Sequence, residues 1–120
     1  MPSANDITRL LLLELPRRYP CRCWRRNSFA AKIGNRFIRS SQLPGEADIT
    51  GILNINGVGI RLEVEVKCGR DSLRPAQIVF GRMIESCGGI YIVARDVESA
   101  LNEIEIRRRS LAARIRTTDS

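Results

Sequence analysis

The sequence predicts an α/β fold, a sandwich in which helices flank a mixed β-sheet. Three features of its 120 residues lead to this prediction. An apolar helical pattern opens the chain, a long hairpin pattern occupies its centre, and a helix, a buried strand and a second helix follow. Neither an internal repeat nor a linker divides the chain, so we expect a single domain over residues 1–120.

A helix is expected near the start of the chain. Ser3 and Asp6 form a capping-box pattern, with aspartate where glutamate is usual. The helix should cover about residues 5–15, and Pro16 should stop it. The leucine run at residues 10–13 makes it apolar on nearly every side, which indicates a buried helix or one in a subunit contact.

An arginine-rich strand is expected next, over residues 19–26. Its arginines are interleaved with aromatic side chains, a combination that suits phosphate contact and base stacking. We favour a core position for Trp24 and phosphate contact for the arginines, and a solvated edge strand is the alternative. Residues 27–35 then read as a loop, residues 37–39 as a short strand and residues 40–45 as a turn.

The hairpin at residues 48–67 carries the strongest pattern in the chain. Asn56-Gly57 predicts a two-residue type I′ turn. Counting outward from this turn gives one apolar face, and a slip of one residue would move that face into water. The apolar pairs are Ile55–Val58, Leu53–Ile60, Gly51–Leu62 and Ile49–Val64.

The same register places Asp48 directly opposite Glu65, with Cβ atoms roughly 4.5–5.5 Å apart, and sends Lys67 to the same face. Like charges in opposed positions destabilise a sheet. A divalent hard cation explains the pair, because Mg²⁺ binds through one or two carboxylates and keeps positions for phosphate and water. The alternative is a solvated edge pair that Lys67 or Arg61 neutralises.

A second helix is expected after a polar loop at residues 68–73. Ser72 is the expected N-cap, and Pro75 lies in the first turn, where proline is tolerated. Gly88-Gly89 should end the helix, and the apolar run at residues 90–94 indicates a buried strand. The apolar stripe of the helix contains Ala76, Val79, Phe80, Met83, Ile84 and Cys87.

A last helix is expected over about residues 97–115, with Asp96 as its cap. Its apolar side contains Val97, Leu101, Ile104, Leu111 and Ile115. Arginines cluster near its end, from residue 107 onward. They indicate a solvated face that complements the helix dipole, and contact with a phosphate backbone or a second subunit is the alternative.

The net charge of +7 favours an anionic partner, nucleic acid before an acidic membrane surface, with an inert basic surface as the alternative. The chain has no histidine, so hydrolysis would need carboxylates, lysine or a metal-bound water. The four cysteines are expected to be reduced and mostly buried, with zinc binding as an alternative. No signal peptide is visible and the leucine run is too short to span a membrane, so a cytoplasmic location is expected.

Three motifs at ordered spacings resemble those of the PD-(D/E)XK nuclease superfamily. They are Asp48, Glu65-Val66-Lys67 and Gln77-x-x-Phe80. More narrowly, about residues 4–104 resemble a standalone VRR-NUC domain, the virus-type replication-repair nuclease. The further matching stretches are Trp24-Arg25-Arg26-Asn27, Gly45-Glu46-Ala47-Asp48-Ile49, Glu63-Val64, Gly69-Arg70, Ser72 through Gln77, and Gly88-Gly89.

The resemblance implies a restriction-endonuclease-like core and a metal-dependent phosphodiesterase acting on DNA. Asp48 and Glu65 would bind Mg²⁺ or Mn²⁺, with the Val66 carbonyl as a further ligand. Lys67 would orient or activate the attacking water, and Gln77 would support Lys67 or the substrate. The candidate nucleic-acid-binding residues are Arg22, Arg25, Arg26, Arg39 and Arg70.

The chain departs from the family pattern in its first helix. The family usually has a glutamate there, three residues before an isoleucine-type position, and this chain has Ala4. Asp6 and Glu14 are the candidates for a fourth carboxylate. The proline that usually precedes the metal-binding aspartate is Ala47 here.

We therefore expect a metal-dependent DNA endonuclease of the phage or mobile-element type, selective for DNA structure and acting in replication, repair or recombination. A homodimer is expected because 120 residues offer a small footprint on DNA. The expected location is the cytoplasm of a bacterium or a phage-infected cell. The alternatives are a catalytically weakened nucleic-acid-binding module of the same fold and a basic RNA-binding or ribosome-associated protein.

Overall fold

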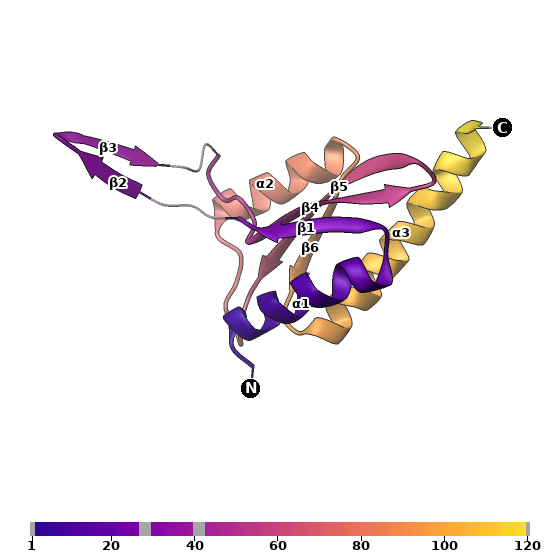
Figure 1. The fold of residues 1–120 in the computed structure, drawn as a ribbon, viewed down its shortest axis with the longest axis horizontal. Coiled ribbons are helices and arrows are strands. Elements are labelled where there is room, and N and C mark those ends of the chain that lie inside the picture. The colour runs from indigo at the N-terminus through magenta and orange to yellow at the C-terminus, as the bar shows by residue number, and fades with distance from the viewer. Residues whose placement is uncertain (1, 27–29, 40–42, 120) are drawn as a thin grey trace.

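A computed structural model describes residues 2–26, 30–39 and 43–119 of the chain. Its elements are α1 Ala4–Arg18, β1 Cys21–Arg25, β2 Ala30–Ile33, β3 Arg36–Arg39, β4 Ile49–Ile55, β5 Val58–Val66, α2 Pro75–Ser86, β6 Ile90–Ala94 and α3 Val97–Asp119. Figure 1 shows a sheet with helices on both sides and the two-stranded hairpin β2–β3 at one end. The predicted α/β class is confirmed.

The main sheet has the strand order β1-β4-β5-β6. The first three strands are antiparallel and β6 runs parallel to β5, so the sheet is mixed, as predicted. The predicted hairpin register is confirmed at every pair from Ile49–Val64 to Ile55–Val58. Asn56 and Gly57 have φ angles of 52° and 86°, and a type I′ turn requires positive values at both positions.

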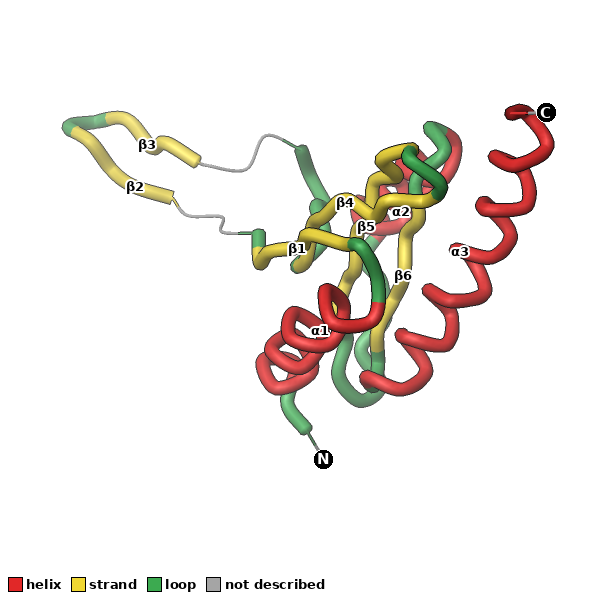
Figure 2. The backbone as a smooth tube through the Cα atoms, turned by 45° about the vertical axis from the view of Figure 1, so that its right-hand side comes forward, coloured by secondary structure: helices red, strands yellow, loops and turns green. Residues whose placement is uncertain are grey.

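The main core lies between one face of the sheet and the helices α1 and α3 (Figure 2). On α1, Ile7, Leu11 and Leu15 are buried because residues four apart share one side of a helix. The apolar face predicted for the hairpin packs against them. The buried residues of the sheet and α3 in this core include Ile49, Leu53, Ile55, Leu62, Val64, Ile90, Ile92, Ala94, Ala100, Leu101 and Ile104.

Helix α2 packs on the opposite face of the sheet, over β6. A small second core there consists of Ala47, Phe80 and Ile84, with Tyr91 packed against it. The predicted apolar stripe was wrong in part, because Val79 is 67% exposed whereas Gln77 and Gly81 are buried. Glycine is required at position 81, since an added Cβ would lie 2.7 Å from the ring of Tyr91.

Helix α1 begins as predicted but ends later than predicted. Ser3 and Asp6 form the expected capping box. Pro16 does not stop the helix, which continues to Arg18 and closes with a hydrogen bond from the Tyr19 N–H to the Leu15 carbonyl. Proline already has a helical φ, and so near the end it removes only one hydrogen bond.

The loop predicted over residues 27–35 was also wrong in its second half. Residues 27–29 lie outside the described part, as do residues 40–42 of the predicted turn. Residues 30–33 form β2, which pairs with β3 through a Gly34-Asn35 turn. Gly34 has a φ of 64°, and a Gly-Asn pair between two strands is itself a hairpin signal.

The capping residue of α2 differs from the predicted one. Arg74, not Ser72, occupies the N-cap, and Pro75 is the first helical residue. The backbone N–H of Ser99 donates to the Asp96 carboxylate at 2.8 Å, so the predicted cap of α3 is confirmed. The helix extends beyond residue 115, to Asp119.

Leu10 and Leu13 are about half exposed, so the leucine run is not buried on every side as predicted. No helix within the described residues combines the length and apolar character that a membrane crossing needs. All four cysteines carry free thiols, and Cys21 and Cys23 share a face of β1. Only Cys21 is buried, while Cys23 and Cys68 are half-buried and Cys87 is exposed, so the expectation of mostly buried cysteines was wrong.

Candidate active site

The candidate site begins with the loop that leads into β4. Gly45 in this loop has a φ of 75°, and an added Cβ would lie 2.3 Å from the Ala76 carbonyl oxygen. The loop therefore lies directly against the first turn of α2. Ala47 of the same loop is only 1% exposed and packs with Phe80 and Ile84 of α2, which fixes the backbone next to Asp48.

Asp48 and Glu65 share one site at the ends of β4 and β5, as the predicted register requires. The Val66 N–H donates to Oδ2 of Asp48 at 2.8 Å, which holds this carboxylate against the end of β5. Glu65 is only 2% exposed. Burial, followed by the hydrogen bond and charge of Asp48, raises the pKa of Glu65 to about 8.

Gln77 comes to this site from α2. Its side-chain N–H donates to Oε2 of Glu65 at 2.7 Å, and its Oε1 accepts from the Arg74 N–H at 2.8 Å. The second bond fixes which end of the amide faces the carboxylate. The resemblance implied a contact with Lys67 or the substrate, and the structure instead gives Gln77 a direct contact with Glu65.

Lys67 follows β5 and supplies positive charge to the pair. Its backbone N–H donates to the Ala94 carbonyl at 2.9 Å, which anchors the residue beside β6. The charges of Lys67 and Arg74 act against the burial of Glu65 and lower its pKa, but they do not outweigh it. The site therefore holds two carboxylates within the field of two cations.

The donor set fits a divalent cation with oxygen ligands. Glu65 is buried and lies against Asp48, which is exposed, so the pair is open to solvent on the Asp48 side. A cation between the two carboxylates would counter both the burial and the Asp48 charge that raise the Glu65 pKa. Within the described residues, no group of three or more acidic, cysteine or histidine side chains could bind a metal ion. The protein would thus supply two carboxylates, and backbone carbonyls or waters would complete the shell, as is usual for Mg²⁺.

The described residues place neither candidate for a fourth carboxylate at the site. Asp6 accepts from the Ser3 N–H at 3.1 Å and caps α1. Glu14 lies in the last part of α1, where it pairs with Arg17 and Arg18. Both carboxylates have local partners on their own helix, so neither reaches Asp48.

A further carboxylate on the same face of β5, that of Glu63, was overlooked by sequence reasoning. It is fully buried, and it accepts from the Thr50 hydroxyl, from Arg26 at 2.8 Å and from Arg61 at 2.9 Å. Arg26 also pairs with Glu46 at 3.3 Å. The hairpin register places Glu63 opposite Thr50, whereas Arg26, which directly follows β1, reaches Glu63 from 37 residues away in the sequence.

Tyr91 on β6 lies close to Glu63 and to the Asp48–Glu65 pair, and its ring faces Gly81 of α2. Burial, followed by the charges of Glu65, Asp48 and Glu63, raises its pKa to about 12. Within the described part of the chain its buried hydroxyl has no hydrogen-bond partner. Its ring packs against Phe80 edge to face, with centroids 6.2 Å apart.

The candidate DNA-binding arginines lie in different environments. Arg22 is exposed on β1, Arg70 is exposed in the turn after β5, and Arg25 donates to the Asn5 side chain at 2.8 Å. The side chain of Arg26 is only 20% exposed because Glu63 and Glu46 bind it. Arg39 belongs to β3, and its side chain lies outside the described part.

The predicted core position of Trp24 is wrong. Trp24 is 52% exposed, and it pairs with Thr50 on the face of the sheet away from α1 and α3. On β1 the core-facing positions belong to Cys21 and Cys23, which lie opposite Leu53 and Gly51.

Comparisons with protein-family models, with curated proteins and with solved structures found no match for this chain.

Proposed function

We propose that this protein is a metal-dependent DNA endonuclease of the VRR-NUC type within the PD-(D/E)XK superfamily. The observation that carries the proposal is the shared site of Asp48 and Glu65, where the Val66 N–H holds one carboxylate and Gln77 holds the other. Lys67 supplies a cation to the same site. A mixed sheet with helices on both faces is the architecture that the resemblance implies, and it supports the proposal.

The residues divide the chemistry between them. A bound Mg²⁺ or Mn²⁺ would neutralise charge on the phosphate and lower the pKa of a bound water. Asp48 and Glu65 would hold that cation, together with the Val66 carbonyl. Lys67 orients the attacking water and stabilises the charge that develops on the phosphate. Gln77 keeps the Glu65 carboxylate in one orientation, since its own amide is fixed by Arg74.

DNA is the proposed substrate because the chain carries a net charge of +7 and exposes arginines on β1 and after β5. We also propose a homodimer, which would extend the footprint on duplex or branched DNA, acting in the cytoplasm of a bacterium or a phage-infected cell. Sedimentation of the protein alone and with DNA tests the dimer separately from the activity.

A cleavage assay tests the function. Linear, nicked, flapped and four-way DNA substrates are incubated with the protein in Mg²⁺, in Mn²⁺ and in chelator. Cleavage by the wild type in metal, with none in chelator and none by Asp48→Asn, is the expected result. If every substrate stays intact at high enzyme concentration in both metals, the proposal is wrong.

One observation favours a second function, a nucleic-acid-binding module of the same fold with weakened catalysis. Neither Asp6 nor Glu14 reaches the carboxylate pair, and Ala4 occupies the position where the family usually has a glutamate. The same assay separates the two, because a binding module shifts DNA in a gel without cutting it.

A further inference from the structure

The face of the sheet that carries Trp24 is arranged in rows across three strands. In one row Trp24 on β1 lies opposite Thr50 on β4, which lies opposite Glu63 on β5. In the neighbouring row Arg22 lies opposite Ile52, which lies opposite Arg61. Side chains directly opposite and diagonal to one another are in reach on such a face. Trp24 and Ile52 are therefore diagonal neighbours flanked by arginines.

Helix α2 packs over β6 on this face. Nearer β1 the rows stay open at Arg22, Trp24 and Ile52, whereas Thr50 and Glu63 are buried. Trp24 and Ile52 are each 52% exposed, which is unusual for two large apolar side chains side by side. They border a shallow hollow of about 450 Å³. The residues that line it are Trp24, Arg26, Thr50, Gly51, Ile52, Gly59 and Arg61.

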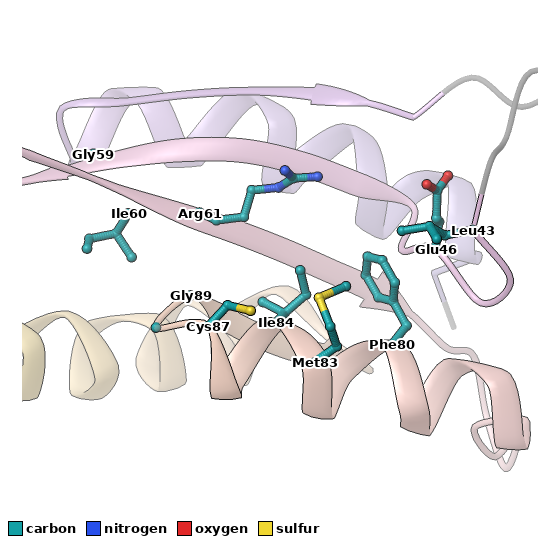
Figure 3. A pocket seen from close by; sticks show the side chains of 11 residues that line it. Leu43, Glu46, Gly59, Ile60, Arg61, Phe80, Met83, Ile84, Cys87 and Gly89 are labelled. Atoms are coloured by element: carbon teal, nitrogen blue, oxygen red, sulfur yellow. The ribbon is translucent and has the colours of Figure 1, made fainter.

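The charges around the hollow favour an anionic occupant. Glu63 lies beneath its floor with no exposed surface, and Arg26 and Arg61 neutralise it. Arg22 is exposed, and 53% of the Arg61 side chain is exposed. Arg61 also lines the groove of Figure 3, where it extends along β5 above Met83 and Phe80 of α2. An apolar surface bordered by guanidinium groups suits a base together with its phosphates.

The hollow lies next to the carboxylate pair. The backbone N–H of Arg26 donates to the backbone carbonyl of Asp48 at 2.8 Å, so Asp48 occupies the row that follows the row of Trp24 and Thr50. Adjacent rows on one face of a strand are about 7 Å apart. One nucleotide of an extended single strand covers that separation, so a base at Trp24 and a phosphate at Asp48 can belong to neighbouring nucleotides.

We propose that Trp24 and Ile52 form a binding site for an unpaired base of single-stranded DNA, with Arg22 and Arg61 beside its backbone. The inference rests on the proposed nuclease function and names its substrate class, which is DNA with a single-stranded segment next to the phosphate to be cut. Every base has a π-face, so the site accepts any sequence. Paired bases in an intact duplex are stacked on their neighbours and do not reach the ring.

Trp24 is the only tryptophan in the chain, so its fluorescence reports directly on the site. Oligothymidylate is titrated into the wild-type protein in chelator, where no cleavage occurs, and Trp24 emission and the anisotropy of a labelled oligonucleotide are followed together. We expect saturable quenching that coincides with binding and weakens with salt. Blunt duplex of the same length should give much less quenching.

Substitutions complete the test. Trp24→Ala should weaken oligothymidylate binding about tenfold, as expected for the loss of one stacked base, while Trp24→Phe keeps most of the affinity. Val79→Ala, which shortens another exposed apolar side chain on α2, is the matched control and should change nothing. Thermal melts of all variants show whether the fold is kept.

The inference would be overturned by binding without quenching, or by an equal loss of affinity in Trp24→Ala and Val79→Ala. It would also be overturned by Trp24 emission that changes with protein concentration alone, because a second copy of the protein would then cover this face. The nuclease proposal is judged separately, by cleavage in metal. Quenching without cleavage would support the base-binding site and contradict the nuclease function. Cleavage without quenching would support the nuclease function and contradict the base-binding site.

Discussion

The side-chain amide of Gln77 on α2 donates a hydrogen bond of 2.7 Å to Oε2 of Glu65 on β5. Both residues are buried. The amide oxygen of Gln77 accepts from the Arg74 N–H, so the same side chain caps the helix and orients the carboxylate. This contact joins the start of α2 to the candidate metal ligands, and the activity of the site should depend on it.

The first prediction concerns this contact. Gln77→Leu keeps the volume of the side chain but removes the donor to Glu65. Cleavage and metal affinity should fall about 10- to 100-fold, the usual effect of losing a partner of a metal ligand. The free energy of unfolding should fall by about 1–3 kcal/mol, because a buried carboxyl loses a hydrogen bond. Single-turnover cleavage at varied Mn²⁺ measures the first effect and urea unfolding the second.

Arg82→Ala is the control for that prediction, since it changes an exposed residue of the same helix. It should leave both quantities within the error of the wild type. A Gln77→Leu protein with unchanged dependence on metal concentration would show that Gln77 has only a structural role.

The second prediction separates catalysis from binding. Asp48→Asn, Glu65→Gln and Lys67→Ala should each lower the rate of cleavage by orders of magnitude. Each should leave DNA affinity largely intact, because affinity comes mainly from arginine–phosphate contacts. Single-turnover cleavage and anisotropy in chelator measure the two quantities on the same DNA. Near wild-type cleavage by Asp48→Asn would mean that the site has been assigned to the wrong residues.

The third prediction contrasts two neighbouring arginines. Arg26→Ala removes the partner of a fully buried carboxylate, and the free energy of unfolding should fall by about 2 kcal/mol or more. The loss stays below the largest values for buried pairs because Arg61 still donates to Glu63. Arg25 is exposed and bonds to Asn5, so Arg25→Ala should be close to neutral in stability.

The salt dependence of DNA binding provides the complementary measurement. Loss of an arginine that contacts a phosphate lowers the salt slope by about one. Because the Arg26 side chain is only 20% exposed, we expect that change for Arg25→Ala and a smaller one for Arg26→Ala. Equal slopes in Arg25→Ala and wild type would locate the DNA path elsewhere, for instance on the arginines of α3.

The hairpin and the carboxylate pair were predictable from sequence because their determinants are local. Asn56-Gly57 fixes the turn, and alternation along both strands fixes the register, so Asp48 meets Glu65 by counting alone. The three helices were predictable from their periodicity, and α1 and α3 also from their caps. The prediction that Pro16 stops the first helix was wrong because the loss of one hydrogen bond near the end of α1 is tolerated.

The errors at the candidate site concern contacts between elements that lie far apart in the sequence. The core position expected for Trp24 was wrong because the pattern of its own strand does not show that α2 leaves that part of the sheet face open. The Arg26–Glu63 pair joins residues 37 positions apart and has no local signal. The position of Gln77 on Glu65 depends on where α2 packs, which its own periodicity does not specify.

The last prediction links metal, pH and stability. The pKa of Glu65 is about 8 in the folded chain and near 4.5 in an exposed glutamate. Between these values the folded protein keeps a proton that the unfolded chain has released. In chelator, the contribution of Glu65 to stability is therefore fully present below about pH 4.5 and is lost as the pH rises through about 8.

Glu65→Gln removes this titration and one of the two opposed charges. Without metal, the mutant should lose less stability than the wild type over that pH range, and at pH 8 it should melt no lower. Lys67→Ala removes a cation that lowers the Glu65 pKa, so it should melt lower than the wild type in chelator at the same pH.

Metal should reverse the order of wild type and Glu65→Gln. A cation that binds only the folded chain adds roughly 2.7 kcal/mol at a hundredfold excess over its Kd, which is several degrees in Tm for a domain of this size. Wild type and Lys67→Ala should show this shift in millimolar Mg²⁺ or Mn²⁺, and Glu65→Gln should show little. Thermal melts of the three proteins at pH 5 and pH 8, with chelator and with metal, measure both the pH dependence of stability and the metal-induced shift in Tm. An equal metal-induced shift in wild type and Glu65→Gln would place the ion away from the carboxylate pair, and the opposition of Asp48 and Glu65 would then need another explanation.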